Sequence, residues 1–319
     1  MSFKITGTGS YLPERIITND DLAKMVDTSD EWITQRVGIK ERHVSENETA
    51  EQMGYEAAKR ALEMSNTKAS ELDLIVASSL TGENLCPTVA GSIQKMLGAS
   101  CPAFDVNSAC SGFLFALDTA AGFFARKKAK KALVVGAERM SKLLDWNDRS
   151  TCVIFGDGAG AAVLEEGEGY LSSQLLTAGG DEVIKIPSGT NNSVFYKNPT
   201  EPMRIFMEGQ ETFKFAVNSI CESITAAADE ANVNISDIKY IVPHQANIRI
   251  IQYASKRLHV PIEKFFVNIE SCGNTSSASV PAALDELNRS QSLKNGDLIA
   301  MTAFGGGLSS ASCIIKWQA

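Results

Sequence analysis

Residues 104–118 read Phe-Asp-Val-Asn-Ser-Ala-Cys-Ser-Gly-Phe-Leu-Phe-Ala-Leu-Asp, and this stretch predicts a short strand that turns abruptly into a helix. Small residues on both sides of Cys110 allow a sharp backbone turn, and Phe113, Leu114 and Leu117 follow it at helical spacing. Cys110 is therefore expected at a helix N-terminus, where the helix dipole favours the nucleophilic thiolate. The alternative is a buried structural thiol, as for most free cysteines.

The composition is that of a globular protein with substantial apolar cores. The chain has 319 residues, of which 44% are hydrophobic. Its seven cysteines are odd in number and form no Cys-x-x-Cys pair, which argues against a metal cage and against a full disulfide framework. The first twenty residues show no signal-peptide core, and no apolar run approaches the length of a membrane span. We therefore expect a soluble cytoplasmic protein.

The net charge of −8 opposes a general attraction to nucleic acid or to an anionic membrane. An acidic partner would have to bind a local basic patch.

Short apolar strands alternate with helical segments along the chain, which predicts a mainly parallel, helix-covered sheet. Asn19 is expected to cap the first helix, and Ser29 or Asp30 a second one. The predicted helices cover residues 20–26, 49–65, 88–97, 210–231, 248–258 and 280–288, and the predicted strands cover 72–79, 132–137, 151–155, 162–164, 238–242, 265–268, 298–302 and 312–317.

Residues 156–161 satisfy the Gly-x-Gly-x-x-Ala pattern of a dinucleotide-binding loop. The helix that such a loop requires is missing, so we predict a tight hairpin here. An NAD-dependent oxidoreductase is accordingly the weakest functional hypothesis. Residues 170–205 are rich in Gly, Asn, Pro and Ser, which indicates an irregular connector between two halves.

Polar residues that can carry chemistry follow three predicted strands. Cys110 follows the first, His244 the second and Asn274 the third, and the glycine loop 305–307 is a fourth element. Sites in α/β proteins form where such loops converge. Taken alone, His244 is also compatible with a structural histidine, and Asn274 with a helix cap or a turn.

At these residues the sequence resembles the β-ketoacyl-acyl carrier protein synthase III family of bacterial type II fatty acid synthesis, a branch of the thiolase-like condensing enzymes. Elongating synthases of that superfamily pair the cysteine with two histidines, so Asn274 indicates the initiating branch. The motifs that carry the resemblance are Asp27-Thr28-Ser29-Asp30-Glu31-Trp32-Ile33, Ser108-Ala109-Cys110-Ser111-Gly112-Phe113, Phe155-Gly156-Asp157-Gly158-Ala159-Gly160, Pro243-His244-Gln245-Ala246-Asn247, Gly273-Asn274-Thr275-Ser276 and Phe304-Gly305-Gly306-Gly307.

The resemblance implies a duplicated, thiolase-like α/β fold with mixed sheets and helices in αβαβα layers. The first half, residues 1–170, would carry Cys110, and the second half, residues 171–319, would carry His244 and Asn274. It also implies a homodimer.

The reaction implied by the resemblance is a ping-pong condensation. Cys110 would take the acyl group from acetyl-CoA or another short or branched acyl-CoA, a substrate and not a cofactor. Malonyl-acyl carrier protein would then lose CO2, and its enolate would attack the acyl group. His244 and Asn274 would donate hydrogen bonds to the enolate oxygen, and the backbone N–H groups of Cys110 and Gly306 to the second oxyanion. The apolar Phe304 would disfavour the buried carboxylate.

The resemblance also implies the binding residues. On spacing alone, Trp32 and Arg36 share a helix face, which is equally compatible with simple packing. By resemblance, the adenine of CoA would lie between Trp32 and Arg149. Thr28, Arg36, Gly209 and Asn247 complete the implied CoA and pantetheine contacts, and Arg249, Lys214 and Lys256 form the implied basic patch for the acyl carrier protein.

Two departures from the family pattern affect substrate choice. Cys86-Pro87 stands where many relatives have Phe-Pro, and Gln210 replaces an asparagine found beside Gly209 in some relatives. The chain length and branching of the primer therefore remain open. Two alternatives remain as well: a secondary-metabolite acyltransferase that uses the same cysteine, and a homologue that only binds its ligands.

Overall fold

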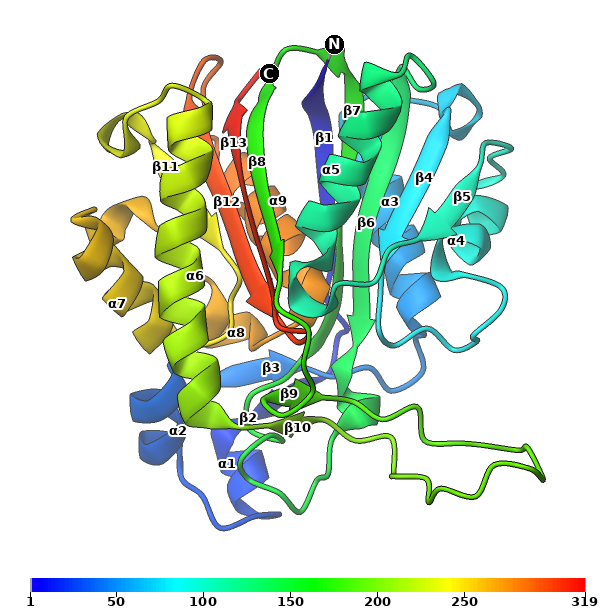
Figure 1. Ribbon diagram of the computed structural model, residues 1–319, viewed down its shortest axis with the longest axis vertical. Helices are drawn as coiled ribbons and strands as arrows, with labels where there is room; N and C mark the ends of the chain where they lie inside the picture. The colour runs from blue at the N-terminus through cyan, green and yellow to red at the C-terminus, as the bar shows by residue number, and fades with distance from the viewer. Residues whose placement is uncertain (1, 319) are drawn as a thin grey trace.

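The computed structural model describes residues 2–318, and two β-sheets standing side by side form its centre (Figure 1). The first has the strand order β1-β7-β6-β4-β5 and the second β11-β12-β13-β8. β4 is parallel to β5 and β6, and β11 is parallel to β12, whereas the other neighbours are antiparallel. The prediction of a mainly parallel sheet is thus wrong, and the mixed sheets implied by the family resemblance are confirmed. The strands are β1 (Ser2–Tyr11), β4 (Leu74–Ser78), β5 (Ala103–Asp105), β6 (Lys131–Arg139), β7 (Asp157–Gly167), β8 (Tyr170–Thr177), β11 (Tyr240–Pro243), β12 (Leu298–Gly305) and β13 (Ser309–Lys316).

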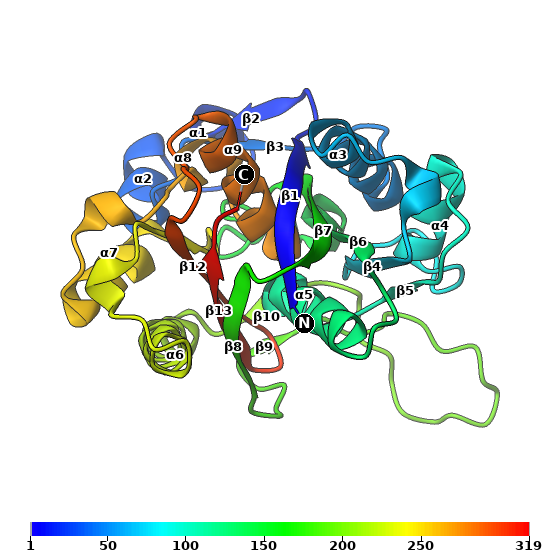
Figure 2. The same ribbon diagram turned by 90° about the horizontal axis from the view of Figure 1, so that it is seen from above.

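Helices form three layers around the two sheets (Figure 2). α3 (Ala50–Met64) and α4 (Val89–Leu97) cover the outer face of the first sheet. α6 (Gly209–Glu230) and α7 (Ile248–Leu258) cover the outer face of the second. α5 (Gly112–Ala125) and α9 (Ser279–Arg289) lie between the sheets and share one apolar core with both. The layer order is therefore αβαβα, as expected.

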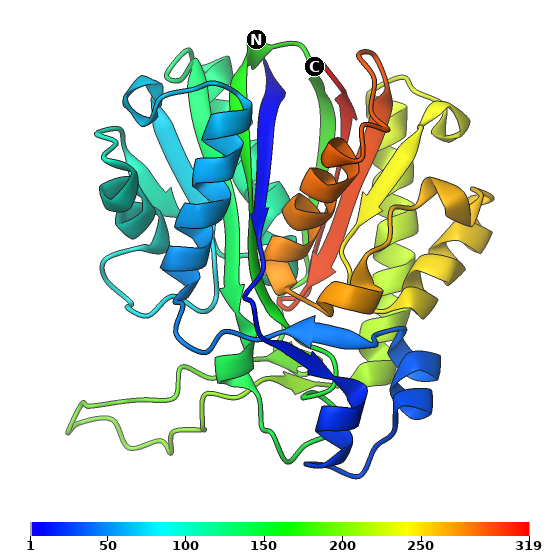
Figure 3. The same cartoon turned by 180° about the vertical axis from the view of Figure 1, so that it is seen from behind.

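The central helix α5 buries an apolar face against both sheets, whereas Asp118 and Thr119 on it are half-buried and Gly122 and Ala125 are exposed. Phe113, Leu114 and Leu117 are each at most 1% exposed and belong to the core that joins the sheets. At the back of the molecule, α3 and α9 lie on either side of β1 (Figure 3, blue and orange).

A smaller cluster of elements lies at the end of the molecule where the catalytic loops emerge (Figure 1, bottom). It contains α1 (Asn19–Ala23), α2 (Asp30–Val37), α8 (Ile269–Cys272) and the short strand pairs β2 (Ile16–Thr18) with β3 (Glu41–His43) and β9 (Ile184–Lys185) with β10 (Phe206–Met207).

Serine and threonine side chains cap the N-termini of helices α1, α2 and α3. Ser29 caps α2, as predicted, and Thr49 caps α3. The cap of α1 is Thr18 and not the predicted Asn19. Asn19 is instead buried, and its side-chain amide donates a 2.7 Å hydrogen bond to the carbonyl of Ile39.

Four further segments differ from the predictions. In the predicted strand 151–155, residues 151–154 form turns, and only Phe155 pairs, in a single bridge to Asn274. Residues 157–161 belong to β7 and make no hairpin, because Gly160 lets this strand pack closely on α9: a Cβ there would lie 2.5 Å from the Ala282 nitrogen. The first part of the predicted connector is strand β8. Of residues 265–268, only Phe265 pairs as a strand, in a single bridge to Ile241.

Between residues 2 and 318, no helix combines the length and apolar character needed to cross a membrane. The same residues include no group of three His, Cys, Asp or Glu side chains placed to hold a metal ion.

Candidate active site

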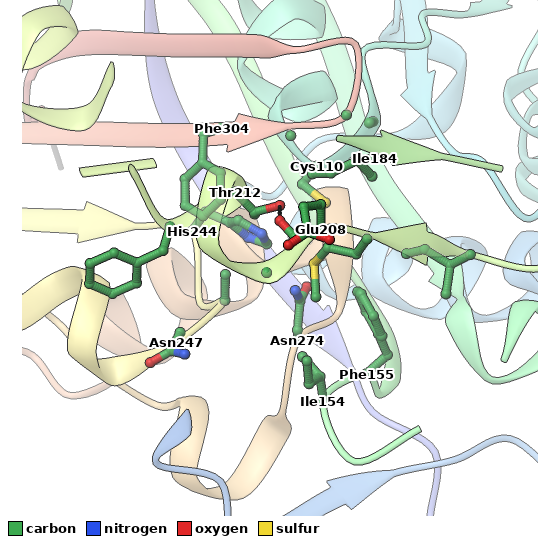
Figure 4. Close-up of a pocket in the computed structure, with 18 of the residues that line it drawn as sticks. Cys110, Ile154, Phe155, Ile184, Glu208, Thr212, His244, Asn247, Asn274 and Phe304 are labelled. Carbon is green, nitrogen blue, oxygen red and sulfur yellow. Dashed lines mark hydrogen bonds between the residues drawn. The ribbon is translucent and has the colours of Figure 1, made fainter. Parts of the chain in front are cut away.

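A cavity of about 1270 Å³ opens between the two halves of the chain. Cys110, His244, Asn274, Phe304 and the glycine loop 305–307 line its inner end (Figure 4). Cys110 and His244 follow strands β5 and β11, which run parallel to their neighbours. β5 belongs to the first sheet and β11 to the second, so the two loops bring residues from both sheets to the same cavity.

Cys110 lies in a single 3₁₀ turn, Ala109–Ser111, directly before α5. Ala109 has a left-handed backbone with φ of 46°, a conformation that non-glycine residues rarely adopt. The Ser111 hydroxyl fixes this turn by donating to the carbonyl of Ser108 at 2.8 Å and by contacting the Ser309 hydroxyl at 2.8 Å. The predicted turn from strand to helix is confirmed.

The β12–β13 hairpin packs directly on the cysteine turn. A Cβ at position 305 would lie 2.7 Å from the backbone nitrogen of Cys110, so Gly305 is required for this close approach. The Ser309 hydroxyl also donates to the carbonyls of Gly306 and Ser108 at 3.0 and 3.2 Å. The glycine loop and the nucleophile are thereby held as one unit.

The protonation state of Cys110 differs from the prediction. Burial raises the pKa of the Cys110 thiol to about 12; a hydrogen bond with the Ser276 side chain acts in the opposite direction, and the nearby carboxylate of Glu138 raises the pKa further. Burial therefore outweighs the helix dipole, and the free protein carries a thiol and not a thiolate.

His244 is a buried, neutral imidazole. Its Nδ1 lies 2.6 Å from the Ser279 hydroxyl. Nε2 is therefore the ring nitrogen that is left to contact a ligand. Its ring meets the Phe304 ring edge-on at a centroid distance of 5.2 Å. Burial lowers the pKa of His244 to about 3, so the ring is uncharged at neutral pH.

Asn274 is fixed along its backbone and at its side chain. Its N–H donates to the carbonyl of Ile154 at 3.0 Å, and its carbonyl accepts from the N–H of Gly156 at 3.0 Å. The N–H of Ser276 donates to Asn274 Oδ1 at 2.9 Å. Because that oxygen is the acceptor, the amide nitrogen is the group left to face a ligand.

The outer part of the cavity contains the aromatic and basic side chains predicted to bind CoA. The guanidinium carbons of Arg36 and Arg149 lie 5.3 and 5.2 Å from the centroid of the Trp32 ring system. Arg149 also donates to the Asp27 carbonyl at 2.6 Å. Gly209, Asn247, Trp32, Arg36 and Arg149 all line the cavity. Thr28 does not line it, and its buried hydroxyl has no hydrogen-bond partner among the described residues.

The predicted basic patch is split by the structure. Arg249 and Lys214 line the cavity, but Lys256, on the same helix as Arg249, does not. Arg249 lies over the Phe213 ring at 5.9 Å, and Lys214 forms a 2.6 Å ion pair with Glu211. Lys256 is exposed and contacts the Tyr253 ring at 5.8 Å.

Comparisons with known proteins agree with this geometry. Family models described as 3-oxoacyl-[acyl-carrier-protein] synthase III and its C-terminal part match residues 104–179 and 228–317. The chain is 47% identical to a Clostridium acetobutylicum protein named β-ketoacyl-[acyl-carrier-protein] synthase III, with 99% of each chain covered. The chain belongs to the β-ketoacyl-acyl carrier protein synthase III family.

Solved structures support the same assignment. The 3-oxoacyl-[acyl-carrier-protein] synthase III of Aquifex aeolicus superimposes with a TM-score of 0.93 at 44% identity, covering 99% of this chain and 100% of the other. The priming β-ketosynthase of the R1128 polyketide pathway gives a TM-score of 0.93 at 35% identity, covering 99% and 96%. The chain is therefore an acyltransferase, an initiating condensing enzyme of fatty acid synthesis with the thiolase-like fold.

In this synthase III, the sequence analysis missed residues that support the three central side chains. Glu138 and Ser279 were not singled out, whereas Ser276 and Gly305 stood in the quoted motifs without a supporting role. A local signal existed for Glu138, because a carboxylate ends an otherwise apolar strand. Ser279 carries no such signal, because its contact with His244 joins residues 35 positions apart.

Proposed function

We propose that this synthase III condenses a short acyl-CoA primer with malonyl-acyl carrier protein in two half reactions at one site. The observation that carries the proposal is the convergence of Cys110, His244 and Asn274 at the inner end of a single cavity. The products are 3-oxoacyl-acyl carrier protein, CoA and CO2. The reaction needs no separate cofactor, since acyl-CoA is itself the acyl donor.

In the first half reaction, the sulfur of Cys110 attacks the thioester carbonyl of acyl-CoA. A new thioester forms on Cys110, the bond to the CoA sulfur breaks, and CoA leaves as a thiol with the proton that Cys110 loses. The backbone N–H groups of Cys110 and Gly306 stabilise the oxyanion. The hydrogen bonds of Ser309 support this role because they hold the two loops together.

In the second half reaction, malonyl-acyl carrier protein loses CO2 and its enolate carbon attacks the acyl carbonyl on Cys110. A carbon–carbon bond forms, the thioester bond to Cys110 breaks, and the released Cys110 thiolate takes up a proton from solvent. Negative charge builds on the malonyl thioester oxygen, and His244 Nε2–H and the Asn274 amide donate to it. A neutral imidazole can keep its Nε2 proton for this purpose, which fits the low pKa of His244. The apolar ring of Phe304 beside His244 disfavours the malonyl carboxylate and promotes its loss.

The outer cavity binds the CoA nucleotide and the pantetheine arm, and its rim binds the acyl carrier protein. Exposed guanidinium and ammonium groups at the rim supply local positive charge on a chain whose net charge is −8. The enzyme acts as a cytoplasmic homodimer. The proposed CoA contacts are Thr28, Trp32, Arg36, Arg149, Gly209 and Asn247, and the proposed carrier-protein contacts are Arg249, Lys214 and Lys256.

The test is the intact mass of the protein after exposure to acetyl-CoA, isobutyryl-CoA or hexanoyl-CoA. Wild-type protein should gain one acyl group, and Cys110→Ser should lose on the order of 10⁴ in acylation rate because a serine hydroxyl is less acidic than a thiol and its oxygen is a weaker nucleophile than sulfur. The relative rates rank the primers. An acylated Cys110→Ser variant, or an unmodified wild type with every donor, would contradict the proposal.

A second candidate is a priming ketosynthase of a secondary-metabolite pathway. The R1128 enzyme, at 35% identity and the same TM-score as the Aquifex aeolicus structure, favours it. Carrier proteins discriminate the two: condensation with a polyketide carrier protein but not with the carrier protein of fatty acid synthesis would support the second candidate.

A further inference from the structure

Glu138 is a buried carboxylate that the proposed reaction does not use. It is 0% exposed and precedes the last residue of β6. Among residues 2–318, no lysine or arginine forms an ion pair with it. Arg139, the next residue, pairs with Glu83, and Lys142 donates to the backbone carbonyls of Thr81 and Gly82. Burial raises the pKa of Glu138, so an ionised carboxylate without a cation must be compensated here by hydrogen bonds, which act in the opposite direction.

Two separate loops supply those hydrogen bonds. The N–H of Leu80 and the hydroxyl of Thr81 donate to Oε2 at 3.0 and 2.8 Å. The hydroxyls of Ser276 and Ser277 donate to Oε1 at 3.1 and 2.8 Å. The Ser79 hydroxyl is a third, longer donor to Oε2 at 3.5 Å. Each carboxylate oxygen thus accepts at least two hydrogen bonds, and only a group with two acceptor oxygens satisfies the donors of both loops.

Ser276, one of the two serines that donate to Oε1 of Glu138, also sets the orientation of the Asn274 side chain. Ser276 has a left-handed backbone with φ of 51°, which is unfavourable for a residue with a side chain. In this conformation its N–H donates to Asn274 Oδ1 at 2.9 Å and leaves the amide nitrogen of Asn274 for the cavity. The hydrogen bonds from Ser276 and Ser277 to Glu138 hold the turn in place against this strain.

We propose that Glu138 is a positioning residue for the second half reaction: its carboxylate holds the Ser276–Ala278 turn in the conformation that directs the Asn274 amide toward the substrate. This inference rests on the proposed function, because it assigns Asn274 to the enolate oxygen.

The Glu138 carboxylate helps to position Asn274, but it disfavours the thiolate form of Cys110. Its negative charge raises the pKa of the Cys110 thiol, although less than burial does. The other ionisable side chain at the inner end of the cavity, His244, is uncharged at neutral pH. Removing the charge of Glu138 therefore favours thiolate formation, while it loosens the turn that holds Asn274. A general loss of rigidity would weaken both functions.

The decisive variant is Glu138→Gln, which keeps the size but offers a single acceptor oxygen. Two rates are measured: CO2 release from malonyl-acyl carrier protein in the presence of acetyl-CoA, and alkylation of Cys110 by iodoacetamide at pH 8. We expect CO2 release to fall about 100-fold, the cost of a misplaced reacting group. We expect alkylation to be as fast as in the wild type or faster.

Asp157→Asn is the matched control. Asp157 is also a 0% exposed carboxylate, lies on the neighbouring strand β7, and accepts hydrogen bonds from the backbone of Ser45 and from the backbone and hydroxyl of Ser141. In Asp157→Asn, CO2 release should not fall while alkylation of Cys110 stays the same or becomes faster. CO2 release within threefold of wild type in Glu138→Gln, or both rates falling together, would overturn the inference.

If circular dichroism shows that Glu138→Gln does not fold, Ser277→Ala takes its place, because it removes one donor and leaves Leu80, Thr81 and Ser276 bound to the carboxylate. It should lose about tenfold in CO2 release and retain acylation by acetyl-CoA; unchanged CO2 release overturns the inference. A wild type that neither becomes acylated nor releases CO2 overturns the proposed function and, with it, this inference. A competent wild type with an unaffected variant overturns this inference alone.

Discussion

The inner end of the cavity and its mouth are built in different ways. At the inner end, His244 and Asn274 are at most 5% exposed, and hydrogen bonds from neighbouring loops hold them. At the mouth, the Arg149 side chain is 48% exposed and contacts Trp32 and Asp27. An adenine lying between Trp32 and Arg149 requires Arg149 to move. The proposed function therefore combines a preorganised inner end with a mouth that adapts to its ligand.

Removing a donor at the rigid end should have the largest effect. Asn274→Ala removes one of two proposed hydrogen bonds to the enolate oxygen, so CO2 release should fall about 100- to 1,000-fold. Acylation of Cys110 by acetyl-CoA should persist, since it does not use this amide. Equal losses in both half reactions, measured by CO2 release and by intact mass, would contradict the proposed division of labour.

A change at the mouth should affect binding more than chemistry. Trp32→Ala removes the ring that stacks on the nucleotide, so the KM for acetyl-CoA should rise about 5- to 30-fold with little change in kcat, in line with about 1 to 2 kcal/mol for a contact of this kind. Acetyl-pantetheine, which lacks the nucleotide, is the control substrate. A similar rise in its KM would show that Trp32 acts on the cavity as a whole.

A charge change at the rim of the cavity should have a smaller effect, and again on binding rather than on chemistry. Arg249→Glu should raise the KM for malonyl-acyl carrier protein by about tenfold at low salt and by less at high salt, because exposed charges are screened. Lys256→Glu, on the same helix but outside the cavity, should have a weaker effect. A larger effect of Lys256→Glu would place the carrier protein farther along α7.

A final prediction concerns the pH dependence of stability at the inner end. The pKa of His244 is about 3 in the folded protein, against an ordinary value of 6.5. Between these values the unfolded chain binds the additional proton, so the free energy of unfolding falls as the pH falls, by at most about 1.4 kcal/mol per pH unit from this group. Urea denaturation at pH 7 to 4 should show a shallower decline in the free energy of unfolding for His244→Asn than for the wild type. If the free energies of the two proteins fall in parallel as the pH falls, the low pKa assigned to His244 is contradicted.

Local sequence patterns predicted several helices and the three central residues of the cavity. α7 begins and ends at the predicted residues, and α6 and α9 lie within one residue of theirs. Cys110, His244 and Asn274 could be singled out because each follows a predicted strand and stands among small or turn-forming residues, although helix α8 and not a strand precedes Asn274 in the structure. Helical periodicity, capping and turn chemistry are short-range effects, so the sequence carries them directly.

Tertiary structure alone decided the rest. The strand pairing that makes the sheets mixed, the inclusion of residues 157–161 in β7, and the thiol form of Cys110 all depend on contacts between distant segments. The hydrogen bond from Ser276 to Glu138 spans 138 positions in the chain. Such contacts fix burial, and burial fixes the charge states of Cys110 and His244, because desolvation depends on the protein packed around a group and not on its neighbours in sequence.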